Sequence, residues 1–286
     1  MFRLYRKYIE RKRRNALEGK VVIITGASSG IGEALSHVFY EYGCKVILAS
    51  RRKSELERVK HDLMCKKVEY PVPEPLVIEL DLSDTHQFEL FIQKVLDSCE
   101  KIDILINNGG VSHRGSIIHT KMDVYEKIMN INYFGSVALT KAVLPHMIAR
   151  KTGHIVFVSS VQGLIAIPDR SAYAAAKHAL QAFGDCLRAE MNQYNIDVSV
   201  VSPGYVKTAV SINALTSSGN NHGVMDKSTA QGFSAEYCAT KILDMVVNKN
   251  NEAIVSQAVP RLAVYLRQAF PSLYFYIMAR RAIKTA

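Results

Sequence analysis

Short apolar runs alternate with longer stretches of helical periodicity along most of the chain. The runs are continuously apolar and rich in valine and isoleucine, which is typical of strands buried on both faces of a parallel sheet. They occupy residues 21–24, 46–49, 76–80, 102–106, 154–158, 198–201 and 253–256. Strands that alternate with helices in this way predict an α/β fold, a doubly wound parallel sheet of about seven strands with helices on both faces.

The stretches between the runs divide into helices and loops. Apolar positions spaced by three or four predict long helices over residues 123–149 and 171–193. Residues 66–75 contain three prolines and therefore predict a surface loop. Residues 211–233 are polar and glycine-rich, and they predict a mobile loop that can cover a pocket. After residue 259, two apolar and aromatic pieces meet at Pro271.

The chain has 286 residues and a net charge of +10, which is concentrated at its two ends. Residues 1–20 contribute +6 and residues 261–286 contribute +5, so the middle is close to neutral. We therefore divide the chain into a basic amphipathic segment (1–20), one α/β domain (21–258) and an apolar, basic extension (259–286). A neutral middle argues against a nucleic-acid partner, whereas basic ends with interleaved aromatic residues suit an anionic membrane surface. Solvated tails are the alternative.

The composition narrows the class of protein further. With 48% apolar and 22% charged residues, the chain can bury a core and does not resemble a disordered protein. No run reaches the ~18 apolar residues of a spanning helix, and no apolar secretory signal begins the chain, so we expect contact with a bilayer surface and no span. Five cysteines form no CxxC pair, and nine histidines show no metal-ligand spacing. We expect buried thiols in a reducing compartment, with neither disulfides nor a metal site.

The first strand runs into the sequence TGASSGIG at residues 25–32, and a helix is expected to follow it. Glycines at such a turn let the backbone approach a pyrophosphate, and the helix N-terminus offers amide groups and positive potential. Gly26, Gly30 and Gly32 therefore predict a Rossmann-type dinucleotide site. An ordinary turn is the alternative.

The end of the second strand indicates which dinucleotide is bound. An acid there would bind the ribose 2′-hydroxyl of NAD, whereas an arginine accommodates the 2′-phosphate of NADP. Arg51 and Arg52 therefore predict NADPH/NADP⁺ over NAD, the alternative being a basic helix start. Asp81 and residues 107–110 follow the third and fourth strands, where open α/β sheets bind ligands, although both also fit turn chemistry.

The strongest group of chemically active residues is Ser160, Tyr173 and Lys177. Tyr173 and Lys177 are four residues apart in a predicted helix and share one face. A free tyrosine has a pKa of ~10. An adjacent ammonium favours the phenolate and allows proton exchange with a substrate oxygen near neutrality. Ser160 ends the fifth strand and can hydrogen-bond that oxygen.

Together these motifs resemble the short-chain dehydrogenase/reductase family over roughly residues 20–257. The matching segments are TGASSGIG, NNGG at 107–110, MNINYFG around Asn132, YAAAK at 173–177 and SPGYVKT at 202–208. The resemblance implies that Tyr173 is the catalytic acid/base and that Lys177 holds the nicotinamide ribose and lowers the pKa of Tyr173. It implies that Ser160 orients the substrate carbonyl and that Asn132 tethers a water in the proton relay.

The same resemblance implies further cofactor contacts and an assembly. The additional cofactor-binding residues would be Ser28, Ser29, Ile31, Asn108, Gly109, Pro203, Gly204, Val206 and Thr208. Gly109 stands where the family usually has alanine, a change between small residues. The two long helices commonly pair between subunits in this family, which makes a homodimer or homotetramer the expected state.

Other segments resemble one membrane-associated branch of the family, among them residues 113–117, 144–156 and 223–232. That resemblance implies a lipophilic ketone substrate, namely an acyl- or alkyl-dihydroxyacetone phosphate, and the cytosolic face of endoplasmic-reticulum or peroxisomal membranes. The phosphate would need a cation near the catalytic residues, and Arg114 and Arg170 are the candidates. A steroid or retinoid dehydrogenase and a non-catalytic NADP-binding protein are the alternatives.

Overall fold

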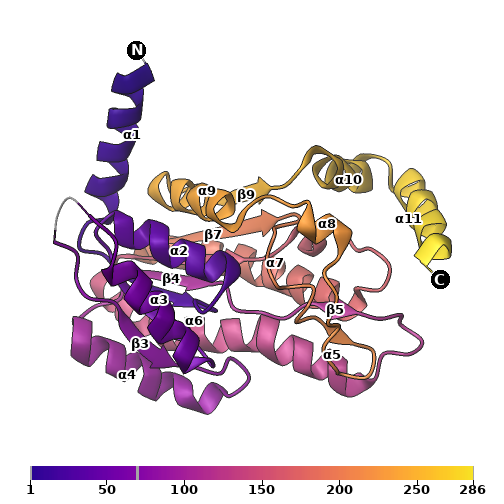
Figure 1. The fold of residues 1–286 in the computed structure, drawn as a ribbon, viewed down its shortest axis with the longest axis horizontal. Helices are drawn as coiled ribbons and strands as arrows, with labels where there is room; N and C mark the ends of the chain where they lie inside the picture. Colours follow the sequence, from indigo (N-terminus) through magenta and orange to yellow (C-terminus); the bar gives the residue numbers. More distant parts are fainter. Residues whose placement is uncertain (1, 69–70, 286) are drawn as a thin grey trace.

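The computed structural model of the chain describes residues 2–68 and 71–285 (Figure 1). At its centre lies a sheet of seven parallel strands in the order β3-β2-β1-β4-β6-β7-β9. The strands are β1 (Val21–Thr25), β2 (Lys45–Ser50), β3 (Leu76–Glu79), β4 (Ile104–Asn107), β6 (Gly153–Val158), β7 (Ile196–Pro203) and β9 (Glu252–Val255). Each apolar run of the sequence overlaps one of these strands, so the predicted doubly wound sheet is confirmed.

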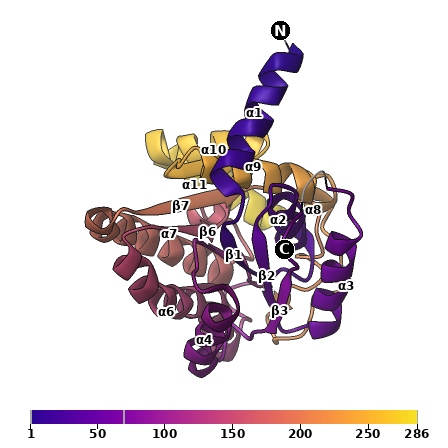
Figure 2. The same cartoon turned by 90° about the vertical axis from the view of Figure 1, so that its left-hand side faces the viewer.

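Helices cover both faces of the sheet because successive strand residues point into two separate cores. Ile24 belongs to the core beneath one group of helices, while its neighbour Ile23 belongs to the other core. The first group is α2 (Gly30–Glu41), α3 (Lys53–Met64) and α9 (Ala235–Val247). The second group is α4 (Phe88–Cys99), α6 (Gly135–Arg150) and α7 (Ser171–Met191). Figure 2 shows α2 and α6 on opposite sides of the sheet.

The helix expected over residues 123–149 consists of three parts. It begins with α5 (Met122–Met129), continues through a π-helical turn (Asn130–Phe134) and ends with α6. A π turn widens the helix by one residue and is frequently found at functional sites. The turn contains Asn132, one of the predicted site residues. Short 3₁₀ turns occupy Thr85–Gln87, Val161–Gly163 and Asn192–Tyr194.

Residues 211–233, which we call the covering segment, contain a strand and a helix, so the expectation of a loop throughout is wrong, while its mobility stays a prediction. The segment contains β8 (Leu215–Thr216) and α8 (Lys227–Ala230). β8 pairs in parallel with β5 (His113–Arg114), so part of its backbone has strand partners. Ser211 and Thr229 are buried. These contacts attach the covering segment to the domain at several points.

The two ends of the chain form helices outside the central layers. α1 (Phe2–Leu17) is fixed by Arg13, whose Nη2 lies 2.7 Å from the Asp244 carboxylate on α9. α10 (Ala258–Ala269) and α11 (Pro271–Thr285) divide at Pro271, as the sequence predicts. Figures 1 and 2 place α1, α10 and α11 on the side of the sheet that α9 covers. Across residues 2–68 and 71–285, no helix combines the length and apolar character needed to cross a bilayer.

The cysteines differ in their exposure to solvent. Cys44 and Cys238 are buried, but Cys65 and Cys186 are exposed, so the expectation of buried thiols throughout is wrong. Cys65 follows the last residue of α3, and Cys186 lies on the outer face of α7, so neither faces the sheet. The described residues of segment 66–75 contain no helix or strand.

Candidate active site

Glycines build the turn between β1 and α2. Gly26 and Gly30 have φ angles of +67° and +59°, in the left-handed region that only glycine adopts without strain. A Cβ atom on Gly32 would lie 2.2 Å from the carbonyl oxygen of Gly26. A Cβ on Gly26 would lie 2.8 Å from the Cα of Gly109, at the end of β4. Side chains are excluded here, so the backbone itself forms the wall of the site.

A cavity of about 510 Å³ opens at the carboxyl ends of β1, β4 and β6. The chain order reverses between β1 and β4, which is where doubly wound sheets bind ligands. The predicted residues that line the cavity are Gly26, Ser28, Ser29, Gly30, Ile31, Arg51, Arg52, Asp81, Asn108, Gly109, Asn132, Ser160, Tyr173, Lys177, Pro203, Gly204, Val206 and Thr208. Gly32 packs beneath the turn and does not line this cavity, and Arg114 and Arg170 line a second one.

Arg52 lies over the glycine turn. Its Nη2 donates to the hydroxyl oxygens of Ser28 at 2.9 Å and Ser29 at 2.8 Å. Arg51 lines the same end of the cavity and is exposed. This end therefore presents two guanidinium groups where an NAD-specific site would present a carboxylate.

A hydrogen-bonded corner joins the ends of β1 and β4. Thr25 Oγ1 accepts from the backbone amides of Asn108 and Gly109, both at 2.9 Å, and Asn108 Nδ2 donates to the Thr25 carbonyl at 2.9 Å. Beside this corner, Asp81 Oδ1 accepts from the backbone amide and hydroxyl of Ser83 at 2.9 and 2.8 Å. Asp81 thus closes a turn while it lines the cavity.

The N-terminal half of α7 brings Tyr173 and Lys177 to the cavity wall. Lys177 is buried, and its Nζ donates to the Val158 carbonyl at 2.8 Å. The same Nζ lies 5.8 Å from the centre of the Tyr173 ring. Ser160 follows β6, and its Oγ accepts from the Gln162 backbone amide at 3.1 Å. The three predicted catalytic side chains therefore line one cavity.

The proton affinities of this group are set by burial and by neighbouring polar groups. Burial lowers the pKa of Lys177 to about 8. Burial also raises the pKa of Tyr173, while a hydrogen bond with Ser160 and the positive charge of Arg114 oppose that rise. The sequence suggested that Lys177 lowers the pKa of Tyr173. In the structure burial raises the pKa of Tyr173 on balance, and the Lys177 Nζ lies 5.8 Å from the centre of the ring, so a lowering by Lys177 stays a prediction.

Asn132 occupies the π turn and is fully buried. Its Oδ1 accepts from the Val111 backbone amide, and its Nδ2 donates to the Val111 carbonyl, both at 2.9 Å. Both ends of the side-chain amide are thereby used to fix the segment between β4 and β5. A Cβ on Gly110 would lie 2.3 Å from Asn132 Oδ1, so this approach also requires glycine.

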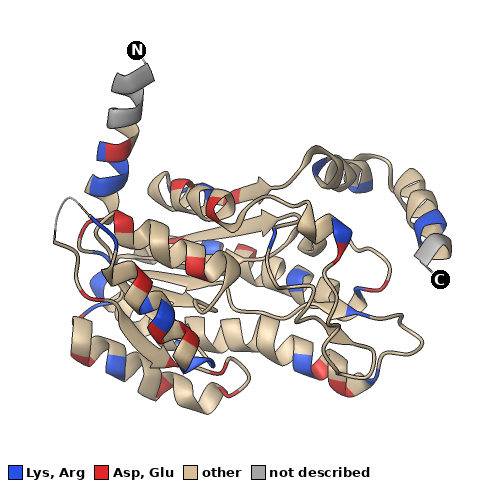
Figure 3. Ribbon diagram, in the orientation of Figure 1, with Lys and Arg blue, Asp and Glu red and all other residues tan. Residues whose placement is uncertain are grey.

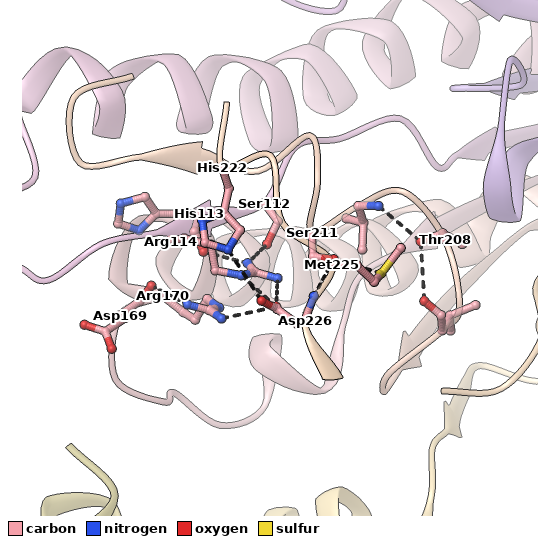
Figure 4. A network of polar contacts seen from close by, with 12 residues as sticks. Ser112, His113, Arg114, Asp169, Arg170, Thr208, Ser211, His222, Met225 and Asp226 are labelled. Atoms are coloured by element: carbon pink, nitrogen blue, oxygen red, sulfur yellow. Dashed lines mark hydrogen bonds and ion pairs between the residues drawn. The ribbon is translucent and has the colours of Figure 1, made fainter. Parts of the chain in front are cut away.

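A second cavity, of about 410 Å³, adjoins the first along Ser160, Tyr173, Gly204, Val206 and Val210. Four basic residues line it, namely Arg114, Arg170, Lys227 and Arg281. Figure 4 shows how Arg114 and Arg170 both turn toward Asp226 of the covering segment. Ser160 and Tyr173 therefore line both cavities.

One carboxylate is shared by the two arginines. Asp226 Oδ2 accepts from Arg114 Nε at 2.9 Å and Nη2 at 2.6 Å, and lies 3.5 Å from Arg170 Nη2. His222 Nε2 lies 3.6 Å from the other oxygen, Oδ1. The arginine side chains are only 10% and 17% exposed, so neither is a solvated loop charge. Burial and the Arg114 charge lower the pKa of Arg170 to about 10.

Three residues of the second cavity escaped the sequence analysis. Asp226 lies in a polar stretch where nothing in the local pattern distinguishes it. Arg281 reaches the cavity from the end of the chain, and only the packing of α11 reveals this. Gln162 follows Ser160 by two residues, and its Oε1 is buried without a hydrogen-bond partner among the described residues.

The fold and this constellation define a nucleotide-dependent oxidoreductase of the short-chain type. The family model described as short chain dehydrogenase matches residues 20–218. The chain belongs to the short-chain dehydrogenase/reductase family, as its motifs predicted.

Relatives of similar length are found in insects and vertebrates. The dehydrogenase/reductase SDR family protein 7-like of Drosophila melanogaster is 53% identical, covering 98% of this chain and 86% of the relative. The dehydrogenase/reductase SDR family member 7B of Xenopus tropicalis is 46% identical, covering 99% and 92%. That of Mus musculus is 45% identical, covering 99% and 88%.

Solved structures share the fold. A short-chain dehydrogenase/reductase from Burkholderia phymatum, in complex with NAD, has a TM-score of 0.78 and 23% identity, covering 90% of this chain and 95% of that chain. A short-chain dehydrogenase from Streptomyces avermitilis has a TM-score of 0.76 and 25% identity, covering 92% and 97%.

The residues of the first cavity fit the NAD(P) cofactor of this family. The glycine turn offers bare backbone at the start of α2, where a pyrophosphate is stabilised by helix amides. When bound, the cofactor supplies or accepts a hydride at its nicotinamide. Lys177 and Tyr173 line the cavity from α7, and Arg52 lines it beside the glycine turn.

Proposed function

We propose that this protein is an NADP(H)-dependent reductase that converts a ketone to a secondary alcohol on a lipophilic substrate with an anionic head, such as an acyl- or alkyl-dihydroxyacetone phosphate. The observation that carries the proposal is the basic second cavity, which shares Ser160 and Tyr173 with the cofactor cavity. The resemblance of the chain to the membrane-associated branch of its family supports the same substrate class.

The preference for NADP(H) rests on Arg51 and Arg52. A 2′-phosphate carries up to two negative charges and is well matched by two guanidinium groups. The serines that hold Arg52 also fix the direction in which its guanidinium points. No carboxylate among the lining residues takes the place that would select the ribose 2′-hydroxyl of NAD at the end of β2.

The anionic head is proposed from the charge balance of the second cavity. Arg114 and Arg170 are largely buried and share a single lining carboxylate, that of Asp226, whereas Lys227 and Arg281 line the cavity from exposed positions. Two buried guanidinium groups with one carboxylate leave a positive charge that a further anion would compensate. A phosphate monoester would provide that compensation and would place its ketone toward Ser160 and Tyr173.

In the proposed reaction, the protein's own residues control the proton. Ser160 and Tyr173 hold the substrate oxygen, and Tyr173 donates its phenolic proton to that oxygen as the carbonyl is reduced. Lys177, whose Nζ lies 5.8 Å from the centre of the ring, stabilises the phenolate that results. Asn132 positions the segment between β4 and β5 at Val111, so that the cavity keeps its shape.

The test is NADPH oxidation by the purified full chain with a long-chain acyl-dihydroxyacetone phosphate and with a neutral long-chain ketone. Arg114→Ala or Arg170→Ala is expected to raise KM for the phosphate about tenfold or more, because a charge-assisted hydrogen bond is lost. The KM for the neutral ketone should change little. Lys121→Ala, at an exposed position outside both cavities, is the matched control.

Other outcomes would redirect the assignment. Activity on steroids or retinals without activity on the ketone phosphate would favour a steroid or retinoid dehydrogenase. NADPH binding without turnover of any carbonyl would favour a non-catalytic cofactor-binding protein.

The proposal extends to where the protein acts and to its assembly. The family resemblance supports the cytosolic face of endoplasmic-reticulum or peroxisomal membranes, which subcellular fractionation tests. It also supports a homodimer or homotetramer, which the molar mass from light scattering tests.

A further inference from the structure

The outer faces of α10 and α11 expose large apolar side chains. They are Val259, Leu262, Tyr265, Phe270, Leu273, Phe275, Tyr276, Ile277 and Ile283, between 41% and 78% exposed. We call these nine residues the C-terminal surface. Single exposed apolar residues are ordinary, but a cluster on two adjacent helices marks an interaction site.

The inner faces of the same helices are packed against the domain, so the outer faces have a fixed direction. Val264 and Tyr274 are buried in a small core together with Ile165. The Tyr274 hydroxyl donates to the Ala166 carbonyl. α10 and α11 are therefore docked parts of the structure, and the exposure of the C-terminal surface is not the fraying of a loose tail.

The charged residues of these helices are all basic. Residues 259–286 contain five Lys/Arg and no Asp or Glu, and Figure 3 shows basic positions on both helices without an acidic one. Two arginines stack on surface aromatics. Arg267 lies 4.7 Å from the centre of the Phe275 ring, and Arg280 lies 5.4 Å from that of Tyr276. Side chains with an apolar body and a polar tip are typical of the headgroup layer of a bilayer.

We propose that the C-terminal surface docks onto the anionic face of a lipid bilayer, with α10 and α11 lying in the headgroup layer. A helix that is apolar on one face and basic around it binds such a layer by burial and by charge attraction. A second copy of this chain fits less well, since a two-fold interface would bring arginines against arginines. This inference does not depend on which ketone the enzyme reduces.

The rest of the molecule agrees with this orientation. α1 projects from the same side of the sheet as α10 and α11 (Figures 1 and 2), and two of its described basic residues, Arg11 and Lys12, are exposed. The side chains of Phe2, Leu4 and Tyr5, which the sequence also suggested for membrane contact, lie outside the described residues. Arg281 of α11 lines the second cavity, so docking would bring the substrate entrance close to the lipid.

The experiment is flotation of the purified full chain with vesicles of phosphatidylcholine, with and without phosphatidylserine. The test variant is Leu262→Ser/Leu273→Ser/Ile277→Ser, which changes exposed positions outside both cavities. The control is Ile117→Ser/Ile118→Ser/Met122→Ser, which changes three apolar residues that are even more exposed but lie away from α10 and α11. Circular dichroism and turnover of a water-soluble ketone confirm that both variants remain folded.

The wild type and the control should float with phosphatidylserine vesicles and much less with phosphatidylcholine alone. The test variant should lose about tenfold or more of its vesicle partitioning, because it lacks three apolar side chains that docking would bury in the headgroup layer. Equal flotation of both variants would overturn the proposal and assign binding to α1. The proposal would also be overturned if the wild type and the control were dimers in lipid-free buffer and the test variant a monomer. The C-terminal surface would then bind a second copy of this chain.

Discussion

The carboxylate of Asp226 accepts two hydrogen bonds from the guanidinium of Arg114, at 2.9 Å from Nε and 2.6 Å from Nη2. The pair joins the covering segment to β5 at the wall of the second cavity. An anionic substrate would need the same donors. Asp226 is therefore expected to compete with the substrate head for Arg114 and Arg170.

Asp226→Asn tests this competition, because it keeps the size of the side chain and removes its charge. KM for an anionic ketone is expected to fall about tenfold, since the arginines no longer release a carboxylate when the substrate binds. KM for a neutral ketone should stay within about twofold. Asp123→Asn, on the exposed side of α5, is the control. An equal change for both substrates would show that Asp226 only supports the fold.

Tyr173→Phe removes the proposed proton donor and retains the ring. We expect NADPH binding to be preserved, as measured by cofactor fluorescence, and kcat to fall about 10²–10⁴-fold. Tyr237→Phe, at an exposed tyrosine on α9, should leave kcat unchanged. Normal turnover by Tyr173→Phe would exclude the mechanism proposed above.

Arg51→Ala, Arg52→Ala and the double variant measure the basis of cofactor choice. The double variant should lose most of the preference for NADPH in kcat/KM. Arg52→Ala should account for the larger part, because Ser28 and Ser29 hold its guanidinium beside the cavity. Lys53→Ala, the next basic residue, is the control. A wild type that uses NADH and NADPH equally would contradict the prediction before any variant is made.

The buried ammonium of Lys177 predicts a pH-dependent stability. Burial lowers its pKa to about 8 from 10.5. Below pH 8 the buried ammonium therefore lowers the free energy of unfolding by its full amount. As pH rises from 8 toward 10.5, the folded state loses the proton while the unfolded state keeps it, and the wild type gains stability. Urea unfolding of the cofactor-free protein at pH 7 and 9.5 should show the wild type gaining about 1–3 kcal/mol relative to Lys177→Met. Lys121→Met should show no such drift.

The fold and the cofactor cavity were predictable because their determinants are local. Apolar runs define the strands of a parallel sheet, and the carboxyl ends of those strands meet at one edge, so Gly26, Asn108 and Ser160 could be placed together from the sequence. Tyr173 and Lys177 needed only the spacing of one helix turn.

The second cavity was not predictable in the same way. Its charge balance depends on Asp226 and Arg281, which come from the covering segment and from α11, far from the catalytic residues along the chain. The sequence predicted an open loop for the covering segment. Its strand β8 has only two residues, which is too few to show the alternation of apolar and polar positions that marks a strand. The π turn at Asn132 was likewise not predicted, and Asn132 is paired there with the backbone of Val111, 21 residues earlier in the chain.

The corner between Thr25 and Asn108–Gly109 also bears on how the protein ages. An asparagine followed by glycine is a pair prone to deamidation, because the unhindered glycine amide attacks the side-chain carbonyl to form a succinimide. In the folded chain, the Gly109 amide donates to Thr25 Oγ1 and the Asn108 side chain is held by the Thr25 carbonyl, so the attacking and attacked groups are both restrained. Stored protein should therefore deamidate at Asn108 at the rate at which this corner opens, and cofactor that keeps the corner closed should slow the loss.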